Sequence, residues 1–178
     1  MSNMMHEISL RGLKLEDSIF MLEWMHDEEI SGCFKFDTRA MTLQDCMSFI
    51  TRSQTNQDSL HFAIVDDSDE YLGTVSLKNI DKLNKQAEYA ISTRKKAHGK
   101  GVALQATKMI LQVAFENIHL NRVYLNVLKS NFRANIFYRK AGFIFERCEV
   151  NSLEIKGKYY DLNWFYMDVS RFNRTYNN

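Results

Sequence analysis

Hydrophobic residues recur along the 178-residue chain with two different periods, and each change of period marks a new element. Where the period is two residues, successive side chains lie on opposite faces of a strand. It predicts seven strands, over residues 8–11, 60–65, 71–77, 86–92, 122–128, 143–150 and 160–169. The second and third of these are expected to form a β-hairpin, and the last two to pair across a turn at Gly157.

Spacings of three and four residues predict four helices, over residues 15–26, 42–53, 102–115 and 131–140. Thr42 and Asp45 stand in the order of a capping box, and Asn131 has the side chain of an N-cap. Gly142 fits a C-terminal stop. Residues 27–40 and 79–85 are predicted to be connections.

The order of the elements predicts the fold class. Strand, two helices, three strands, helix, strand, helix and two strands is a mixed order typical of one α/β (α+β) domain with a mainly antiparallel sheet and helices on its faces. The chain has no proline and no Gly/Ser-rich linker. We therefore expect residues 1–178 to form a single domain.

The composition narrows the classes of partner. A formal net charge of +1 argues against broad electrostatic binding of nucleic acid or a membrane surface. The three cysteines, Cys33, Cys46 and Cys148, are odd in number and widely spaced, which favours reduced thiols. No apolar run reaches the ~18 residues of a membrane span, and the first residues do not have the pattern of a signal peptide. We expect a soluble, cytoplasmic protein.

The stretch EYAISTRKKAHGKGVALQAT, residues 88–107, carries the strongest candidate chemistry. Here a strand runs into a glycine-bearing turn and directly into a helix. Gly99 and Gly101 would let the backbone approach a ligand, and the helix would aim its free N–H groups at the same place. This arrangement favours a phosphate site, with cationic side chains nearby from Arg94, Lys95, Lys96, His98 and Lys100. An ordinary solvated turn remains the alternative.

Other ligand-binding motifs fit less well. A dinucleotide-binding loop would need a third glycine where Leu104 stands, and a Walker A loop would need Ser or Thr where Gly101 follows Lys100. The five histidines have no companions at zinc-ligand spacing, so we predict no metal.

Three stretches together resemble the GNAT superfamily of acetyl-CoA-dependent N-acetyltransferases. The family's loop pattern, Arg or Gln followed by x-x-Gly-x-Gly or Ala, lies over residues 96–101, with Lys96 in place of Arg or Gln. LKSNFRANIFYRKAGF, residues 128–143, is similar to the family's strand, Asn, helix and Gly-Phe segment. ISLRGLKLEDS, residues 8–18, and the closing strands resemble the subgroup of ribosomal-protein alanine acetyltransferases, the RimJ and RimL type.

The resemblance implies a six- to seven-stranded sheet with a splayed central strand pair and acetyl-CoA as co-substrate. The cofactor pyrophosphate would lie across the loop, the pantetheine arm along the strand before it, and Asn131 nearby. The residues implied in cofactor binding are Ala90, Ile91, Ser92, Lys96, Ala97, His98, Gly99, Lys100, Gly101, Val102 and Asn131.

The same resemblance implies the catalytic roles. An amine must be neutral to attack a thioester, so the site needs a proton acceptor and a place for oxyanion charge. Glu88 is the candidate base, with a solvent-facing strand residue as its alternative. Tyr138 is the candidate acid for the departing thiolate, with a packed aromatic as its alternative. A backbone N–H near Ile91 would hold the oxyanion.

The acceptor is the least determined part. The connection 24–40 and the turn 157–160 would line its site, with Trp24 either stacking on the acceptor or packing in the core. Three acidic side chains would attract a cationic amine or a protein N-terminus: Asp27, Glu28 and Glu29. Three basic side chains would instead attract a nucleotide-linked amino sugar: Lys35, Arg39 and Lys78. We expect a small-molecule amine or protein N-terminus as acceptor, and a monomer or homodimer. The alternatives are a non-catalytic coenzyme A-binding or protein-interaction module, and an enzyme using a different phosphorylated ligand.

Overall fold

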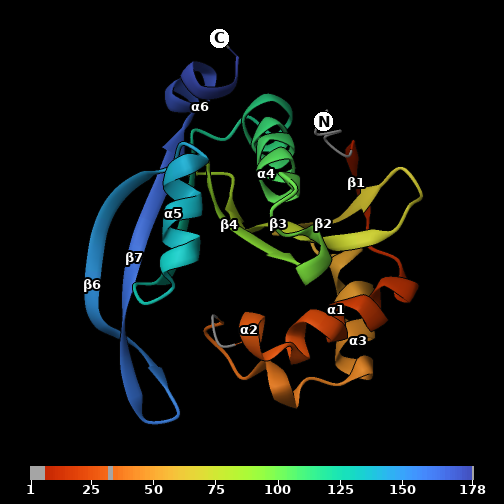
Figure 1. The fold of residues 1–178 in the computed structure, drawn as a ribbon. Helices are drawn as coiled ribbons and strands as arrows, with labels where there is room; N and C mark the ends of the chain where they lie inside the picture. Colours follow the sequence, from red (N-terminus) through yellow and green to blue (C-terminus); the bar gives the residue numbers. More distant parts are fainter. Residues whose placement is uncertain (1–6, 32–33, 178) are drawn as a thin grey trace, which may run out of the picture.

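A single seven-stranded sheet forms the centre of the molecule (Figure 1). The computed structural model describes residues 7–31 and 34–177, so Cys33 lies outside the described residues. The strands are β1 (Ile8–Gly12), β2 (Leu60–Asp66), β3 (Tyr71–Asp81), β4 (Gln86–Thr93), β5 (Arg122–Leu128), β6 (Ile144–Ile155) and β7 (Lys158–Asp168). Their spatial order is β1-β2-β3-β4-β5-β7-β6. Neighbouring strands are antiparallel except β4 and β5, which are parallel.

Six α-helices cover the sheet in the described part of the chain. They are α1 (Ser18–His26), α2 (Glu28–Ser31), α3 (Leu43–Ser53), α4 (Val102–Gln112), α5 (Phe132–Lys140) and α6 (Val169–Tyr176). Helix α3 begins with the predicted capping box of Thr42 and Asp45, and the Asn131 side chain caps α5 by accepting from the Ala134 N–H. Figure 1 shows α4 on one side of the sheet and α1 with α3 on the other.

Each face of the sheet has its own hydrophobic core. On the α4 side, Ile110, Phe165 and Phe172 are fully buried against the inward residues of β3, β4 and β5. On the α1 and α3 side, Trp24 and Ile50 pack against the second set of strand residues. Trp24, considered above as an acceptor-stacking residue, is 5% exposed and therefore belongs to this core.

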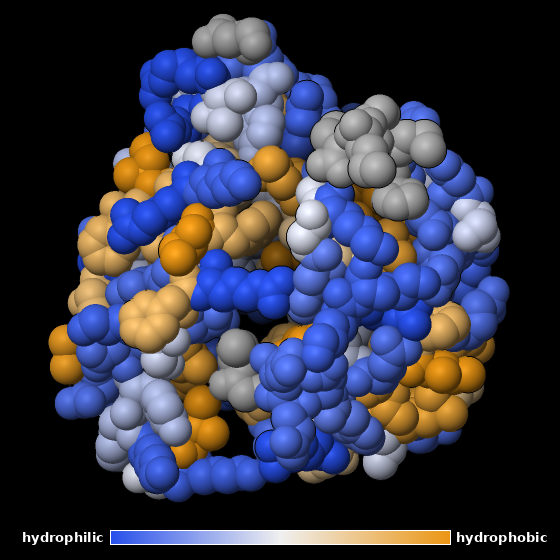
Figure 2. Space-filling view, in the orientation of Figure 1, coloured by the Kyte–Doolittle hydropathy of each residue, from blue (hydrophilic) through white to orange (hydrophobic). Residues whose placement is uncertain are grey.

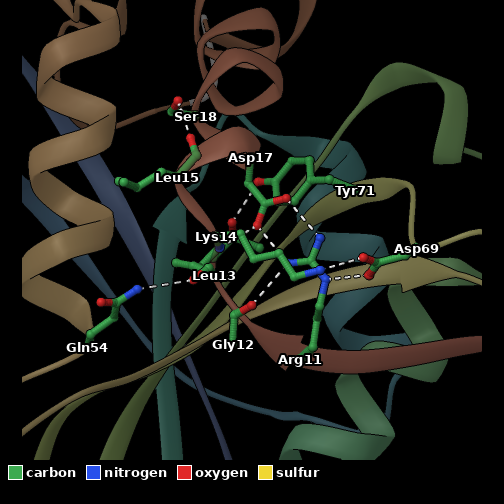
Figure 3. Close-up of polar contacts among 11 residues, drawn as sticks. Arg11, Gly12, Leu13, Lys14, Leu15, Asp17, Ser18, Gln54, Asp69 and Tyr71 are labelled. Atoms are coloured by element: carbon green, nitrogen blue, oxygen red, sulfur yellow. Dashed lines mark hydrogen bonds and ion pairs between the residues drawn. The ribbon is translucent and has the colours of Figure 1, made fainter.

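A partly buried ion pair joins the start of α1 to the edge of the sheet (Figure 3). The Arg11 guanidinium donates to both oxygens of Asp17, at 2.8 and 2.9 Å, and Asp17 is 1% exposed. Arg11 and Lys14 also contact Asp69 in the β2–β3 turn. These carboxylates raise the pKa of Arg11, so the guanidinium stays protonated. The contact fixes the entry angle of the α1 segment, from which the acceptor-side connection begins.

The central opening of the sheet lies between β4 and β5. Their parallel pairing is limited to Gln86–Glu88 against Arg122–Tyr124. Beyond Glu88 the two strands have no paired residues, while β5 continues beside β7 through Leu128. The splayed pair expected from the family resemblance is therefore present.

The structure corrects several boundaries. The last strand was predicted through Val169, but β7 ends at Asp168, whose side chain accepts from the Arg171 N–H and begins α6. The loop predicted over 79–85 is shorter because β3 continues to Asp81. Strands β6 and β7 form a longer hairpin than predicted, and the connection 27–40 contains α2. The seven strands, the mainly antiparallel sheet and the helices on both faces confirm the predicted fold.

Candidate active site

The glycine-bearing loop places several backbone N–H groups without backbone partners at the start of α4. Gly99 and Gly101 have φ values of 74° and 76°, the left-handed region that glycine adopts without strain. The Ala97 and His98 N–H groups already donate to backbone oxygens within the preceding turn, both at 3.0 Å. Among the described residues, the N–H groups of 99–104 donate no well-formed backbone hydrogen bond before Gln105 bonds to Gly101. Free N–H groups at the start of a helix are suited to bind an anion.

Most of the basic side chains beside the loop are engaged elsewhere. Arg94 is 8% exposed and donates to both oxygens of Glu23, at 3.0 and 2.8 Å, and to Glu70 at 2.9 Å. Lys96 also binds Glu70, at 2.6 Å, and Lys95 pairs with Glu29 at 2.7 Å. These three side chains hold the loop against α1, α2 and the β2–β3 turn.

The remaining two basic residues of the run lie closer to the loop glycines. His98 is partly buried, and this burial lowers the pKa of its imidazole. Lys100 is exposed, and no ion pair joins it to a carboxylate among the described residues. Lys100 is therefore the loop cation that is available to a ligand.

Strand β4 leads from the sheet opening to this loop. One of its edges pairs with β3 through Thr93, whereas the edge facing β5 has no partner after Glu88. Ala90, Ile91 and Ser92 therefore lie on a strand with a free edge, and each is partly buried. A free strand edge is able to pair with an extended, amide-containing ligand.

Glu88 lies at the last paired position of β4, opposite Tyr124. Its side chain is 14% exposed, and both carboxylate oxygens have partners: Lys78 Nζ at 3.1 Å and Asn79 Nδ2 at 2.9 Å. The carboxylate is held at the mouth of the opening by two residues of β3.

Tyr138 lies on the other side of the sheet. Its ring packs against Tyr89, Phe143 and Phe165, with centroid separations of 6.1, 5.9 and 6.0 Å. Burial raises the pKa of Tyr138 to about 12, so the phenol keeps its proton at neutral pH. Among the described residues no hydrogen bond to its hydroxyl is found, which leaves the O–H free to donate to a ligand. Asn131, at the other end of α5, is occupied as the cap described above.

Several of the acceptor-side charges form ion pairs. Glu28 lies 3.3 Å from Arg39, and Glu29 pairs with Lys95. Lys35 differs, because its ammonium donates a hydrogen bond to Asn126 Oδ1 on β5. Sequence reasoning did not find this contact, since 91 residues separate its partners. Figure 2 shows this side of the molecule hollowed between the long β6–β7 hairpin and the α1 side, with both hydrophilic and hydrophobic side chains around the opening.

The described residues lack what a metal site and a membrane-spanning helix require. Within residues 7–31 and 34–177, no group of three or more His, Cys, Asp or Glu side chains is placed to hold a metal ion. Over the same ranges, no helix combines the length and apolarity needed to cross a membrane.

Comparison with known proteins agrees with this geometry. The family model of the acetyltransferase (GNAT) domain matches residues 7–144. A spermidine N(1)-acetyltransferase from Vibrio cholerae is 29% identical over 111 residues, 62% of this chain and 64% of that protein. The ribosomal-protein-serine acetyltransferase of Escherichia coli K12 is 27% identical over 97 residues, 54% of either chain. The alignments thus span less than two thirds of each of these relatives.

Solved structures extend the likeness along the chain. The crystal structure of spermidine N-acetyltransferase from Vibrio cholerae in complex with CoA and spermine has a TM-score of 0.84 to this chain, at 23% identity. The superposition covers 93% of this chain and 97% of that one. Because the family model covers most of the chain and the fold agrees along nearly its whole length, this chain belongs to the GNAT acetyltransferase domain family.

Proposed function

We propose that this protein transfers an acetyl group from acetyl-CoA to a primary amine, by direct attack in a ternary complex. One observation carries the proposal: the open N–H groups at the start of α4 adjoin the free edge of β4, which leads to the opening between β4 and β5. An anion receptor joined to a free strand edge matches a cofactor with a pyrophosphate at one end and an amide-rich arm.

The geometry refines how coenzyme A would bind. The pyrophosphate would accept from the N–H groups of residues 99–104, since those of Ala97 and His98 are already bonded. Lys100 would add a charge, whereas the Lys96 side chain is held by Glu70. The pantetheine arm would pair with the backbone of Ala90 to Ser92, and Asn131 would flank it from α5.

The proposed chemistry uses the two faces of the opening. The amine attacks the thioester carbonyl from the Glu88 side, and Glu88, directly or through water, accepts the proton that the nitrogen loses. A backbone N–H near Ile91 would stabilise the oxyanion. Tyr138, protonated by virtue of its raised pKa, returns a proton to the thiolate from the opposite face.

The acceptor is a primary amine whose identity we assign only by class. The relatives named above act on spermidine or on a ribosomal protein, and the candidates for this chain are a small polyamine, a protein N-terminus and an amino-sugar nucleotide. The pairing of Glu28 and Glu29 with basic residues reduces the acidic charge available to a polycation. The presence of Lys35 and Lys78 near Glu88 favours an acceptor that also carries an anionic group.

A non-catalytic coenzyme A-binding module is the second candidate. It is favoured by one observation, that Lys78 and Asn79 occupy both oxygens of Glu88. In that case the carboxylate would only hold β3 and β4 together.

A thiol-release assay separates these functions. Purified protein with acetyl-CoA would be offered spermidine, a peptide with a free N-terminus and an amino-sugar nucleotide. Thiol release with at least one amine supports the enzyme. Saturable binding of acetyl-CoA without thiol release for any amine supports the binding module, and failure of free coenzyme A to compete would point to another phosphorylated ligand.

A further inference from the structure

Lys35 places an amine of the protein itself at the acceptor side of the opening. It lies in the connection between α2 and the short 3-10 turn Thr38–Ala40, and its side chain is partly buried. Its Nζ donates to Asn126 Oδ1 on β5. Asn126 is two residues beyond Tyr124, the last β5 residue that pairs with β4, so both side chains leave the same face of the strand.

That face is the one that carries Glu88. Glu88 and Tyr124 are paired neighbours on parallel strands, and their side chains project to the same side. The Lys35 ammonium is attracted by the Glu88 carboxylate and repelled by the Lys78 ammonium. The Lys35 amine therefore lies on the acceptor side of the point where β4 and β5 separate.

The surroundings of Lys35 lower the pKa of its amine. Among the described residues no carboxylate forms an ion pair with it, and Glu88 is bound by Lys78 and Asn79. Burial is the main cause that lowers the pKa of Lys35; Glu88 acts in the opposite direction, and Lys78 acts in the same direction as burial. The exposed Lys95 is opposite in character, since Glu29 binds it and raises its pKa.

We propose that Lys35 is a site of intramolecular acetylation, in which the protein transfers acetyl from its own bound acetyl-CoA to the Lys35 amine. The inference rests on the proposed function, because it uses the same cofactor and the same opening. No separate binding step is needed, since the amine is already held by Asn126.

The reaction balances without another reactant. The Lys35 ammonium first gives a proton to solvent, and the nitrogen lone pair then attacks the thioester carbon. A carbon–nitrogen bond forms and the carbon–sulfur bond breaks. The proton lost from nitrogen passes to Glu88 or water, and the coenzyme A thiolate takes a proton from Tyr138 or solvent. Acetyl-Lys35 is neutral, so the modification removes one of the two lysine charges that face Glu88.

A competing amine should slow the modification. In the proposed arrangement an external acceptor reaches Glu88 from the face of the sheet on which Lys35 contacts Asn126. Saturating acceptor amine is therefore expected to reduce the rate of Lys35 acetylation, whereas an unrelated surface lysine would be unaffected.

The experiment incubates the full chain with acetyl-CoA and no added amine, and follows acetyl adducts by intact mass and peptide mapping. We expect one dominant adduct at Lys35, formed with a first-order rate independent of protein concentration. Lys35→Arg, which keeps the charge, should lose this adduct, and the matched Lys95→Arg should retain it. Glu88→Gln should slow its formation by about 10-fold or more.

Several results would overturn the proposal. Equal acetylation of Lys35 and Lys95, or a rate unchanged by Glu88→Gln, would mean simple chemical acetylation. A rate proportional to protein concentration would mean transfer between molecules. If Lys35 stays unmodified, the inference is wrong. Thiol release with external amines would then show that the proposed function still holds. Absence of that release would show that the proposed function is wrong as well.

Discussion

The Glu88 side chain leaves β4 on the face of the sheet opposite to the one on which Tyr138 packs. Tyr89, the next residue of β4, contacts the Tyr138 ring in the α4-side core, and neighbouring residues of a strand point to opposite faces. A thioester held between β4 and β5 would therefore have its proton acceptor on one side and its proton donor on the other.

Glu88→Gln tests the acceptor half of this arrangement. The amide keeps the shape and a hydrogen-bonding oxygen but cannot accept the proton of the attacking amine. We expect thiol release to fall by about 100-fold or more, the usual contribution of a general base. Acetyl-CoA affinity, measured by titration calorimetry, should change little. An equal loss of binding and turnover would instead assign Glu88 to the folding of β3 against β4.

Tyr138→Phe tests the donor half. Removing one hydroxyl leaves the aromatic packing in place, so we expect lower turnover, by about 10-fold or more, with little loss of acetyl-CoA affinity. Since the pKa of Tyr138 is raised to about 12, the phenol stays protonated and donor-competent up to that pH. The wild-type rate should therefore show no decline from Tyr138 between pH 7 and 10. Unchanged turnover of the variant would remove Tyr138 from the mechanism.

Gly99→Ala tests the backbone approach of the cofactor, and Gly157→Ala is its matched control. Both glycines have positive φ, 74° and 77°, and a Cβ on either would meet no atom within 4 Å. Each variant should lose about 1 kcal/mol of unfolding free energy from backbone strain alone. We expect only Gly99→Ala also to weaken acetyl-CoA binding. Equal affinities in the two variants would show that the loop does not contact the cofactor.

Lys100→Ala and Arg94→Ala should separate the two kinds of cation in the loop run. Lys100 is exposed, so its removal should weaken acetyl-CoA binding several-fold, by about 0.5–1 kcal/mol, with an unchanged melting temperature. Arg94 is buried between two carboxylates, and its loss should cost about 2 kcal/mol or more of stability. Thermal melts with and without coenzyme A distinguish the effects. A stable Arg94→Ala protein that has lost affinity would contradict this division.

Local patterns were sufficient to predict most of the elements. Strand β5 and the caps at Thr42 and Asn131 occur where the sequence placed them, because period and capping depend on near neighbours. Helix α6 was missed because only Phe172 and Tyr176 mark its apolar face, and its start depends on a single cap at Asp168.

The site could be predicted only where it consists of consecutive backbone. The loop glycines and the start of α4 follow from a local motif. The pairing of Arg94 with Glu23, 71 residues apart, and of Lys35 with Asn126 depends on how distant elements meet. A charge run in the sequence therefore overstated the number of cations available to the cofactor.

The most direct test of the central claim is thiol release from acetyl-CoA by the purified protein, measured with the three amines and repeated with Glu88→Gln. We predict release that requires a primary amine, saturates with acetyl-CoA and falls by about 100-fold in the variant. Saturable acetyl-CoA binding with no amine-dependent release by the wild-type protein would contradict the account.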